Sequence, residues 1–155
     1  RANDPIKRFN LIRDTLFKNK DRIKKIKICG AENPNFGNYL GYVSDKELNN
    51  LYNSSKFVLL PSKAEGIGLP MIEALICGAL PIACSDNETA KEFLPLDFIC
   101  EPDPNKILKH IDKLDKEYSI KRKLAFKLGT KYKKKFSKVS VAENILNIIK
   151  WFTFL

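Results

Sequence analysis

The chain has 155 residues, of which 44% are hydrophobic and 30% charged, a composition that fits one globular domain with its own core. No apolar run reaches the roughly 18 residues of a membrane span, and the polar start RANDPIKRFN lacks the apolar segment of a signal peptide, so a membrane-spanning or secreted protein is not predicted. The net charge is +10, and residues 103–155 carry 14 basic but only 5 acidic side chains, so nearly all of the excess lies in the last third.

Helical patterns and short apolar runs alternate over the first 100 residues. In chain order the pattern predicts a helix over 5–20, strands over 26–29 and 39–43, a helix over 44–55, a strand over 57–60, a helix over 70–78, a strand over 81–84, a helix over 87–94 and a strand over 98–100. In the first helix one side is expected to carry Phe9, Ile12, Leu16 and Phe17. The second helix opens with Ser44, which has Glu47 three residues later, as in a capping box.

The apolar runs are continuous rather than alternating, as in parallel strands that are covered on both faces. After residue 102 the strands cease, and helices are expected over 103–118, 119–136 and 139–155. In the second of these, a stripe that repeats every four residues is expected to face the core: Ile120, Leu124, Leu128, Tyr132 and Phe136. Because strands and helices alternate with short loops, the predicted fold class is α/β, a Rossmann-like parallel sheet with helices on both faces.

The last third of the chain also holds a strongly basic run. Nine basic residues and no acidic residue lie between Lys121 and Lys138. Such a run is either the solvated face of a helix or a surface that meets anionic lipid. No recognition motif for nucleic acid accompanies it, so a nucleic-acid partner is not predicted.

The cysteines and the single histidine do not form a metal-binding pattern. Cys29, Cys77, Cys84 and Cys100 make no C-x-x-C pair and no zinc spacing. Each lies in or at the end of an apolar run, so we expect buried free thiols in a reducing compartment, which predicts a cytoplasmic protein. His110 lies in a helical pattern without metal-ligating neighbours and is expected at the surface or its boundary.

In parallel α/β folds, ligands bind outside the carboxyl ends of the strands, so the loop that follows the strand over 57–60 is the first candidate. Gly66 and Gly68 in this loop allow positive φ angles and a close approach of the backbone to a ligand. Pro70 suits the first turn of a helix, whose free amides and partial positive charge then face the crevice. The loop therefore predicts an anion site, for which phosphate is the usual ligand.

Two carboxylates flank this predicted anion site. Glu65 directly precedes the glycines, and Glu73 lies one turn inside the helix. Ionised carboxylates only accept hydrogen bonds, which suits paired hydroxyl groups. A nucleotide-sugar diphosphate carries hydroxyls on both sides of its phosphates, so such a donor fits the arrangement. The sequence contains no Asp-x-Asp, so a metal-dependent sugar transferase is not suggested, and neither a metal nor a cofactor is predicted.

The segment EGIGLPMIEALICGALPIA, residues 65–83, resembles the E-x7-E segment of retaining glycosyltransferases with the two-domain GT-B fold, often called family 4. The matching residues are Glu65, Gly66, Gly68, Leu69, Pro70, Glu73, Ala74, Gly78, Pro81 and Ala83. The segments LYNSSKFVLLPS and GYVSDKELNNLY, and the N-terminal RANDPIKRF with Arg1 and Lys7, resemble other segments of the same family in the same order. The resemblance spans about the first 100 residues.

This resemblance implies roles for individual residues. Arg1 and Lys7 would hold the diphosphate and stabilise its negative charge as it leaves, and with Glu65 they form the expected catalytic set. Glu65 would contact the hydroxyls of the sugar, and Glu73 those of the ribose. The remaining expected donor contacts, made mostly by backbone groups, come from Gly30, Val43, Gly66, Ile67, Gly68 and Leu69, with Val43 next to the base.

The resemblance also implies that residues 1–155 form the C-terminal, donor-binding half of a GT-B fold, beginning just after the first strand of that half. Its expected partners are a nucleotide-sugar donor and an N-terminal acceptor domain of the same polypeptide, without which transfer is not expected. The expected reaction retains the configuration of the sugar and serves polysaccharide, glycolipid or glycoprotein glycan synthesis. We expect a cytoplasmic location, with peripheral contact to the inner membrane face through residues 121–138.

Three other interpretations stay open. Gly66 and Gly68 precede a helix and Asp86 follows the next strand, as in the dinucleotide fingerprint of an oxidoreductase, although Met71 takes the place of the third glycine. A glycosidase with paired carboxylates would not need an anion site. The chain could also be a non-catalytic module that binds nucleotide sugars.

Overall fold

The computed structural model of the chain describes residues 4–17 and 20–153. Its strands are short and all of its pairings are parallel, which confirms the predicted fold class. In chain order the elements are α1 (Phe9–Phe17), α2 (Lys20–Ile23), β1 (Lys27–Ile28), β2 (Asn38–Tyr39), α3 (Asp45–Ser54), β3 (Phe57–Leu60), α4 (Leu69–Ile76), β4 (Leu80–Cys84), α5 (Glu88–Phe93), β5 (Ile99–Cys100), α6 (Pro104–Lys116), α7 (Tyr118–Lys135) and α8 (Lys138–Thr153).

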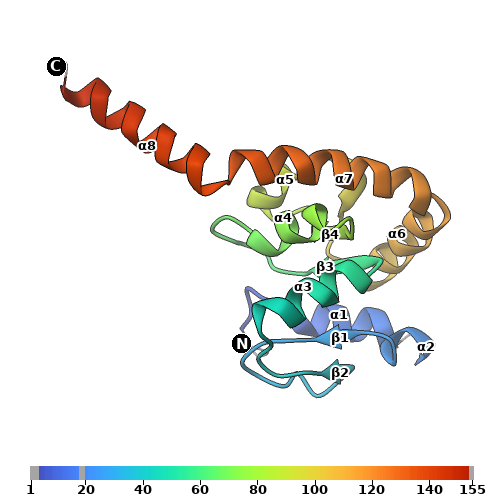
Figure 1. The fold of residues 1–155 in the computed structure, drawn as a ribbon. Helices are drawn as coiled ribbons and strands as arrows, with labels where there is room; N and C mark the ends of the chain where they lie inside the picture. Colours follow the sequence, from blue (N-terminus) through green and yellow to red (C-terminus); the bar gives the residue numbers. More distant parts are fainter. Residues whose placement is uncertain (1–3, 18–19, 154–155) are drawn as a thin grey trace.

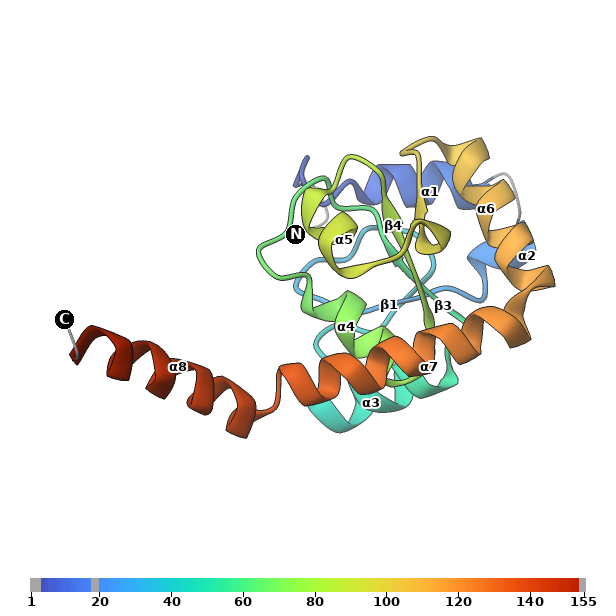
Figure 2. The ribbon, with the colours of Figure 1, turned by 90° about the horizontal axis from the view of Figure 1, so that it is seen from above.

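The strands form two hydrogen-bonded groups, β1–β2 and β3–β4–β5 (Figure 1). Seen from above, the strands run through the middle of the molecule, with α3, α4 and α7 on one side and α1 and α6 on the other (Figure 2). Helix α7 crosses over α4, and α8 continues away from the body of the protein in both views. The layers therefore place the loops at the carboxyl ends of the strands along one edge, where the site is expected.

Local sequence explains where the helices begin. The capping box at α3 is confirmed, since the Ser44 side chain accepts from the Glu47 amide and the Glu47 side chain accepts from the Ser44 amide. Asn87 caps α5 by accepting from the Ala90 amide, and Asp103 caps α6 ahead of Pro104. Each cap satisfies amides that would otherwise lack a partner.

Strand β4 is the most deeply buried strand, with all five of its residues in the core. It contains Pro81, which cannot donate a ladder hydrogen bond. The Leu80 amide donates to the Lys56 carbonyl, so Leu80 faces β3 and Pro81 faces β5. Pairing with β5 starts only at Ala83, opposite Ile99, so the proline leaves no gap in a ladder.

The buried apolar side chains form two clusters rather than one. The larger lies around β4, α4, α6 and α7, and the smaller consists of Ile12, Leu16, Ile28 and Phe36. Leu59 on β3 contacts both clusters.

The structure corrects the predicted stripe on the helix over 119–136. Ile120 is 71% exposed and Phe136 is 37% exposed, so neither faces the core as predicted. The middle of the stripe is confirmed, since Tyr132 is buried and Leu124 and Leu128 pack against the core, and the buried face also includes Ala125 and Gly129. Gly129 sets this face, because a Cβ there would lie 2.3 Å from the Leu75 carbonyl oxygen of α4, closer than the two helices allow.

Other predictions were wrong in detail. Phe17, predicted on the core side of the first helix, is 58% exposed, whereas Ile12 and Leu16 are buried as predicted. Thr15 is buried as well, and its hydroxyl donates to the Leu11 carbonyl. The strand predicted over 39–43 ends at Tyr39, because Gly41 turns the chain with φ +70°. Phe98, predicted to begin a strand, ends a short 3-10 turn instead.

The four cysteines are free, as predicted, but not all are buried. Burial raises the pKa of the Cys84 thiol to about 11 and that of Cys100 to about 12, so both stay protonated near neutral pH. Cys77 is half-buried and Cys29 is exposed, so the prediction of burial fails for Cys29. His110 is half-buried, at the boundary that the sequence predicted.

Candidate functional site

The loop between β3 and α4, residues 61–68, carries most of the candidate site residues. Hydrogen bonds with other segments hold its backbone, among them the Lys63 amide to the Ile6 carbonyl at 2.8 Å, the Asn87 side-chain amide to the Ser62 carbonyl at 3.0 Å, and the Thr89 hydroxyl to the Glu65 carbonyl at 2.7 Å. Asn87 is fully buried and also caps α5, so it fixes the loop relative to α5. The loop is therefore anchored to the segment before α1 and to the start of α5.

Lys7 and Glu65, which the sequence predicts in one site, are brought together across 58 residues. The Lys7 Nζ lies 2.7 Å from Glu65 Oε1. The lysine side chain is 40% exposed and that of the glutamate 19%, so the pair lies at the surface with its cation open to solvent. Because exposed pairs contribute little to stability, an incoming anion can compete with the carboxylate for the lysine.

Arg8 is the main residue that the sequence reasoning missed. Its Nε donates to the Pro61 carbonyl at 2.7 Å, and its two terminal nitrogens donate to the two Asp86 carboxylate oxygens at 2.8 and 2.9 Å. These hydrogen bonds hold the pKa of Asp86 below its usual value. Arg8 thus joins the segment before α1 to the loops that follow β3 and β4, directly beside Lys7.

Arg8 also has an unusual backbone. Its φ angle is +48°, a conformation that non-glycine residues rarely adopt. The side-chain contacts to Pro61 and Asp86 supply the free energy that holds this conformation. The only signal in the sequence was its position next to Lys7.

The start of α4 matches the predicted glycine turn at Gly68, whereas Gly66 does not have the positive φ angle that was expected there. Gly68 is the N-cap residue with φ +68°, and Pro70 follows in the first turn. A Cβ on Gly68 would lie 2.0 Å from the terminal methyl of Met71, whereas a Cβ on Gly66 would meet nothing within 4 Å. Gly66, Ile67 and Leu69 are exposed, with Ile67 at 53% and Leu69 at 54%, whereas Gly68 is buried, so the residues around the N-cap rather than Gly68 itself are open to solvent.

Glu73 is held by a tyrosine from the neighbouring helix. The Tyr52 hydroxyl on α3 donates to Glu73 Oε2 at 2.9 Å. Burial, followed by the hydrogen bond and the charge of Glu73, raises the pKa of Tyr52 well above its usual value, so the phenol remains a donor. No spacing in the sequence pointed to Tyr52, because α3 and α4 meet only in the folded chain.

Gly30 and Val43 lie on the loops that leave β1 and β2. The Gly30 amide donates to the Gly41 carbonyl at 2.9 Å, and the Tyr39 hydroxyl donates to the Gly30 carbonyl at 2.7 Å. Val43 is half-buried directly before the Ser44 cap of α3. Both therefore lie at the carboxyl ends of their strands, in the other hydrogen-bonded group from the loop at 61–68.

Arg1, which the resemblance places with Lys7, lies outside the described residues. Among residues 4–17 and 20–153, no three His, Cys, Asp or Glu side chains gather as metal ligands would. Within that same part of the chain, no helix is long and apolar enough to cross a membrane.

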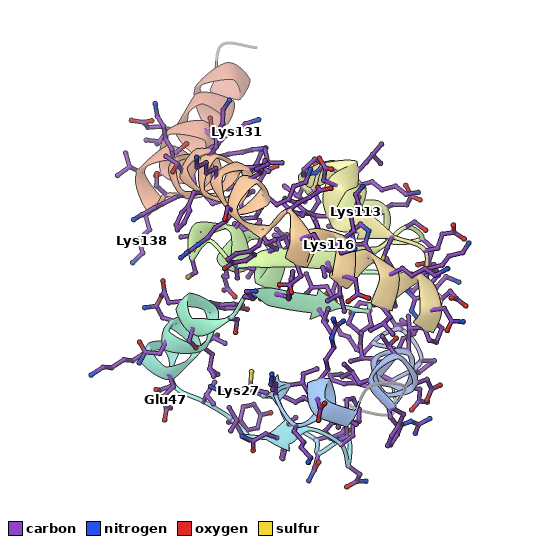
Figure 3. The ribbon with its side chains drawn as sticks, turned by 90° about the vertical axis from the view of Figure 1, so that its right-hand side faces the viewer. Lys27, Glu47, Lys113, Lys116, Lys131 and Lys138 are labelled. Carbon is purple, nitrogen blue, oxygen red and sulfur yellow. The ribbon has the colours of Figure 1, made fainter. Side chains whose placement is uncertain are left out.

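The basic run lies on α7 and reaches the start of α8. Most of its side chains are exposed, and Lys131 and Lys138 lie on either side of the turn between the two helices (Figure 3). Lys121 does not belong to this exposed surface. Its ammonium lies 2.8 Å from Asp97 and 3.4 Å from Glu117, and its side chain is only 16% exposed.

The comparisons with known proteins fit this arrangement. In solved structures, the chain is similar to sucrose-phosphate synthase from Thermosynechococcus elongatus, with a TM-score of 0.73 at 19% identity over 90% of this chain and 42% of that one. It is also similar to the catalytic domain of cholesterol-alpha-glucosyltransferase from Helicobacter pylori, with a TM-score of 0.66 at 15% identity over 84% and 93% of the two chains. At these identities the similarity concerns the fold.

Sequence similarity points the same way. The chain is 44% identical over 54 residues to O-antigen chain mannosyltransferase B of Escherichia coli, covering 35% of this chain and 14% of that protein. It is 46% identical over 41 residues to a serotype-specific mannosyltransferase of Escherichia coli, covering 26% and 5% of the two. The chain thus spans only a small part of these relatives. The family model for glycosyl transferases group 1 matches residues 18–136, and the chain belongs to that family.

Proposed function

We propose that this chain is the donor-binding part of a retaining glycosyltransferase that uses a nucleoside-diphosphate sugar. The observation that carries the proposal is the contact of Lys7 with Glu65 beside the glycine turn that opens α4. One edge of the sheet then carries a cation, the free amides at the start of a helix and a carboxylate acceptor. These are the groups that a sugar attached to a diphosphate requires.

In this proposal the diphosphate displaces the Glu65 carboxylate from Lys7. The ammonium and the amides near Gly68 then lie where negative charge grows as the bond between sugar and phosphate breaks, and Arg1 adds a second cation. Fixed positive charge at that position lowers the barrier without reorganisation during the reaction. Once released, Glu65 accepts hydrogen bonds from the hydroxyls of the sugar.

The ribose is assigned to Glu73. Tyr52 occupies one carboxylate oxygen, Oε2, which leaves Oε1 to accept from the ribose hydroxyls. Because the tyrosine stays protonated, it also keeps the carboxylate in one orientation. Gly30 and Val43 contribute backbone contacts on the base side, at the ends of β1 and β2.

The acceptor is assigned to a separate N-terminal domain of the same polypeptide. The relatives are several times longer than the matched segments, which cover 14% and 5% of their lengths. Without that domain the chain would bind a donor but transfer no sugar. One of these relatives is named for an O-antigen chain, and a role in polysaccharide, glycolipid or glycoprotein glycan synthesis at the cytoplasmic side is the corresponding proposal for this chain.

One other function has support, a module that binds nucleotide sugars without catalysis. It would use the same residues and differ only in lacking an acceptor domain. A dinucleotide oxidoreductase has less support, because the acid that it would use for ribose, Asp86, is already bound by both terminal nitrogens of Arg8.

Calorimetry tests the proposal on the chain itself. UDP, GDP and ADP are titrated separately, followed by the matching nucleosides, into the wild type and the variants Lys7→Ala and Glu73→Ala. Lys7→Ala should weaken the binding of the diphosphate more than that of the nucleoside, and Glu73→Ala should weaken both. Lys63→Ala, which removes an exposed lysine from the same loop, is the matched control and should change neither. The absence of binding by all three diphosphates to the wild type would overturn the proposal.

A further inference from the structure

Two adjacent cations of the segment before α1, Lys7 and Arg8, have different surroundings. The Lys7 side chain is 40% exposed, and its ammonium pairs with the Glu65 carboxylate. The Arg8 side chain is only 20% exposed. Its guanidinium donates to the Pro61 carbonyl and, through both terminal nitrogens, to the two carboxylate oxygens of Asp86. Lys7 can therefore exchange its partner for another anion, whereas the hydrogen bonds of Arg8 are made within the protein.

Lys7 lies between two points at which this segment is attached to the loop after β3. On one side, the Ile6 carbonyl accepts a hydrogen bond from the Lys63 amide at 2.8 Å. On the other side, Arg8 Nε donates to the Pro61 carbonyl at 2.7 Å. Because the attachments flank Lys7 directly, they decide where its ammonium lies relative to this loop.

The backbone between these attachments forms a turn that starts at Asp4. The Asp4 carbonyl accepts from the amides of Lys7 at 3.0 Å and Arg8 at 3.2 Å. The Asp4 carboxylate accepts from the Ile6 amide at 2.8 Å. The turn ends at Arg8, whose φ angle of +48° is unfavourable for a residue with a side chain and persists only where surrounding contacts hold it. The turn that presents Lys7 is therefore maintained by the side chain of the next residue.

The groups that hold Arg8 are themselves fixed. Asp86 follows β4 and precedes Asn87, whose fully buried side chain donates to the Ser62 carbonyl at 3.0 Å. A carboxylate that accepts from both terminal nitrogens also fixes the plane of the guanidinium. The hydrogen bonds from Arg8 keep the pKa of Asp86 below its usual value, so the pair stays ionised at neutral pH. Arg8 therefore connects the turn at Lys7 to a rigid part of the fold.

We propose that Arg8 is a positioning residue for the diphosphate site, which holds Lys7 in place through Pro61 and Asp86 without contacting the ligand. The inference rests on the proposed function, since it takes Lys7 as the cation that binds the diphosphate of the donor. It adds that an ion pair outside the ligand contacts decides where the Lys7 ammonium is held. The effect of Arg8 on ligand binding should therefore pass through Lys7.

A direct contact between Arg8 and a phosphate is the alternative. To make it, both terminal nitrogens would have to leave Asp86, and the aspartate would remain as an unpaired carboxylate beside an anion. Lys7 gives up its contact with Glu65, and its side chain is twice as exposed as that of Arg8. The geometry therefore favours a ligand contact through Lys7 and support from Arg8.

A double-mutant cycle tests whether Arg8 acts through Lys7. Calorimetry measures the affinities of UDP, GDP and ADP, and of the matching nucleosides, for the wild type, Lys7→Ala, Arg8→Ala and the double variant. Diphosphate binding should weaken about tenfold in Lys7→Ala and about fivefold in Arg8→Ala, while nucleoside binding is unchanged in Arg8→Ala. The double variant should bind about as well as Lys7→Ala, whereas independent contributions would multiply to about fiftyfold.

Two further variants control for charge and for folding. Arg8→Lys keeps the positive charge, but one ammonium does not replace the hydrogen bonds of the guanidinium, so diphosphate binding should still weaken about threefold. This variant also replaces Arg8→Ala in the cycle if the alanine variant does not fold. Arg13→Ala removes a 40% exposed arginine of α1 that pairs with the adjacent Asp14, and it should leave both affinities unchanged. Without ligand, the NMR order parameter of the Lys7 amide should fall from about 0.85 toward about 0.6 in Arg8→Ala and stay unchanged in Arg13→Ala.

The outcomes separate this inference from the proposed function. Full diphosphate affinity in Arg8→Lys, an equal loss of nucleoside affinity in Arg8→Ala, or an unchanged order parameter at Lys7 would each overturn the inference. If Lys7→Ala weakens diphosphate binding and the losses multiply in the double variant, the proposed function stands and the role of Arg8 is rejected. If no diphosphate binds, or if Lys7→Ala changes nothing, the proposed function is rejected, and the order parameter alone decides whether Arg8 holds Lys7.

Discussion

Replacing Arg8 separates two effects of this residue, its side-chain contacts and its backbone conformation. Arg8→Ala removes the hydrogen bond to the Pro61 carbonyl, which is worth about 1.5 kcal/mol for a charged donor. It also removes the pair with Asp86, which is worth only about 0.5 kcal/mol because the aspartate side chain is 36% exposed. The expected loss in the free energy of unfolding is therefore about 2 kcal/mol.

Arg8→Gly loses the same contacts but tolerates the φ angle of +48°. Relief of the backbone strain should therefore make the loss in the free energy of unfolding about 1 kcal/mol smaller than in Arg8→Ala, after allowing for the larger entropy loss of glycine on folding. For a domain of this size, Arg8→Ala should lower the melting temperature by about 6 °C and Arg8→Gly by about 3 °C.

Calorimetric melting and urea denaturation measure these differences. The matched control is Arg13→Ala, because the Arg13 side chain is 40% exposed and its ion pair is with the adjacent Asp14 in the same helix. Its expected change in the free energy of unfolding is within about 0.5 kcal/mol. Equal losses for Arg8→Ala and Arg8→Gly would refute the argument about backbone strain. No loss in either variant would refute the argument that Arg8 joins the three loops.

Four further results are expected. Tyr52→Phe should weaken nucleoside diphosphate binding severalfold in calorimetry, because Glu73 loses the donor that orients it; unchanged affinity would separate Tyr52 from the site. Gly68→Ala should lower the free energy of unfolding by about 1 to 2 kcal/mol because the position has a positive φ angle, while the end of the flexible Met71 side chain can move aside. An unchanged midpoint of urea denaturation would contradict this argument. Burial lowers the pKa of His110, so the unfolded chain binds the proton more readily and stability should fall as the pH drops below about 6.5; His110→Gln should reduce that fall in urea titrations, and identical pH profiles would reject it. Exposed basic residues of α7 should carry the chain to vesicles that contain anionic lipid at low salt but not at high salt, and co-sedimentation that does not depend on salt would count against an electrostatic surface.

Much of the fold could be predicted because local signals agreed with the tertiary structure. The run over 57–60 became β3, and the Ser44 capping box started α3. The glycine turn at Gly68 was predictable because its φ angle favours glycine and Pro70 marks the first turn of a helix.

The rest depends on contacts between distant segments. The two ends of the stripe on α7, Ile120 and Phe136, were predicted wrongly, and the repeat of apolar side chains gave no sign of Gly129, where the close approach of α4 decides the packing. Arg8 reaches Asp86 across 78 residues, and Tyr52 reaches Glu73 between two helices. Neither pairing leaves a pattern in the sequence, and the positive φ of Arg8 is visible only in the folded backbone.

An NMR titration with UDP, GDP and ADP tests the central claim most directly, because it locates the ligand without requiring an acceptor. If the diphosphate binds at the N-terminus of α4, the largest shifts of amide signals should occur at Lys7 and over residues 65–69. The matching nucleoside should leave these signals nearly unchanged. Shifts confined to α6 and α7, or equal shifts at the α4 turn for nucleoside and diphosphate, would contradict the account.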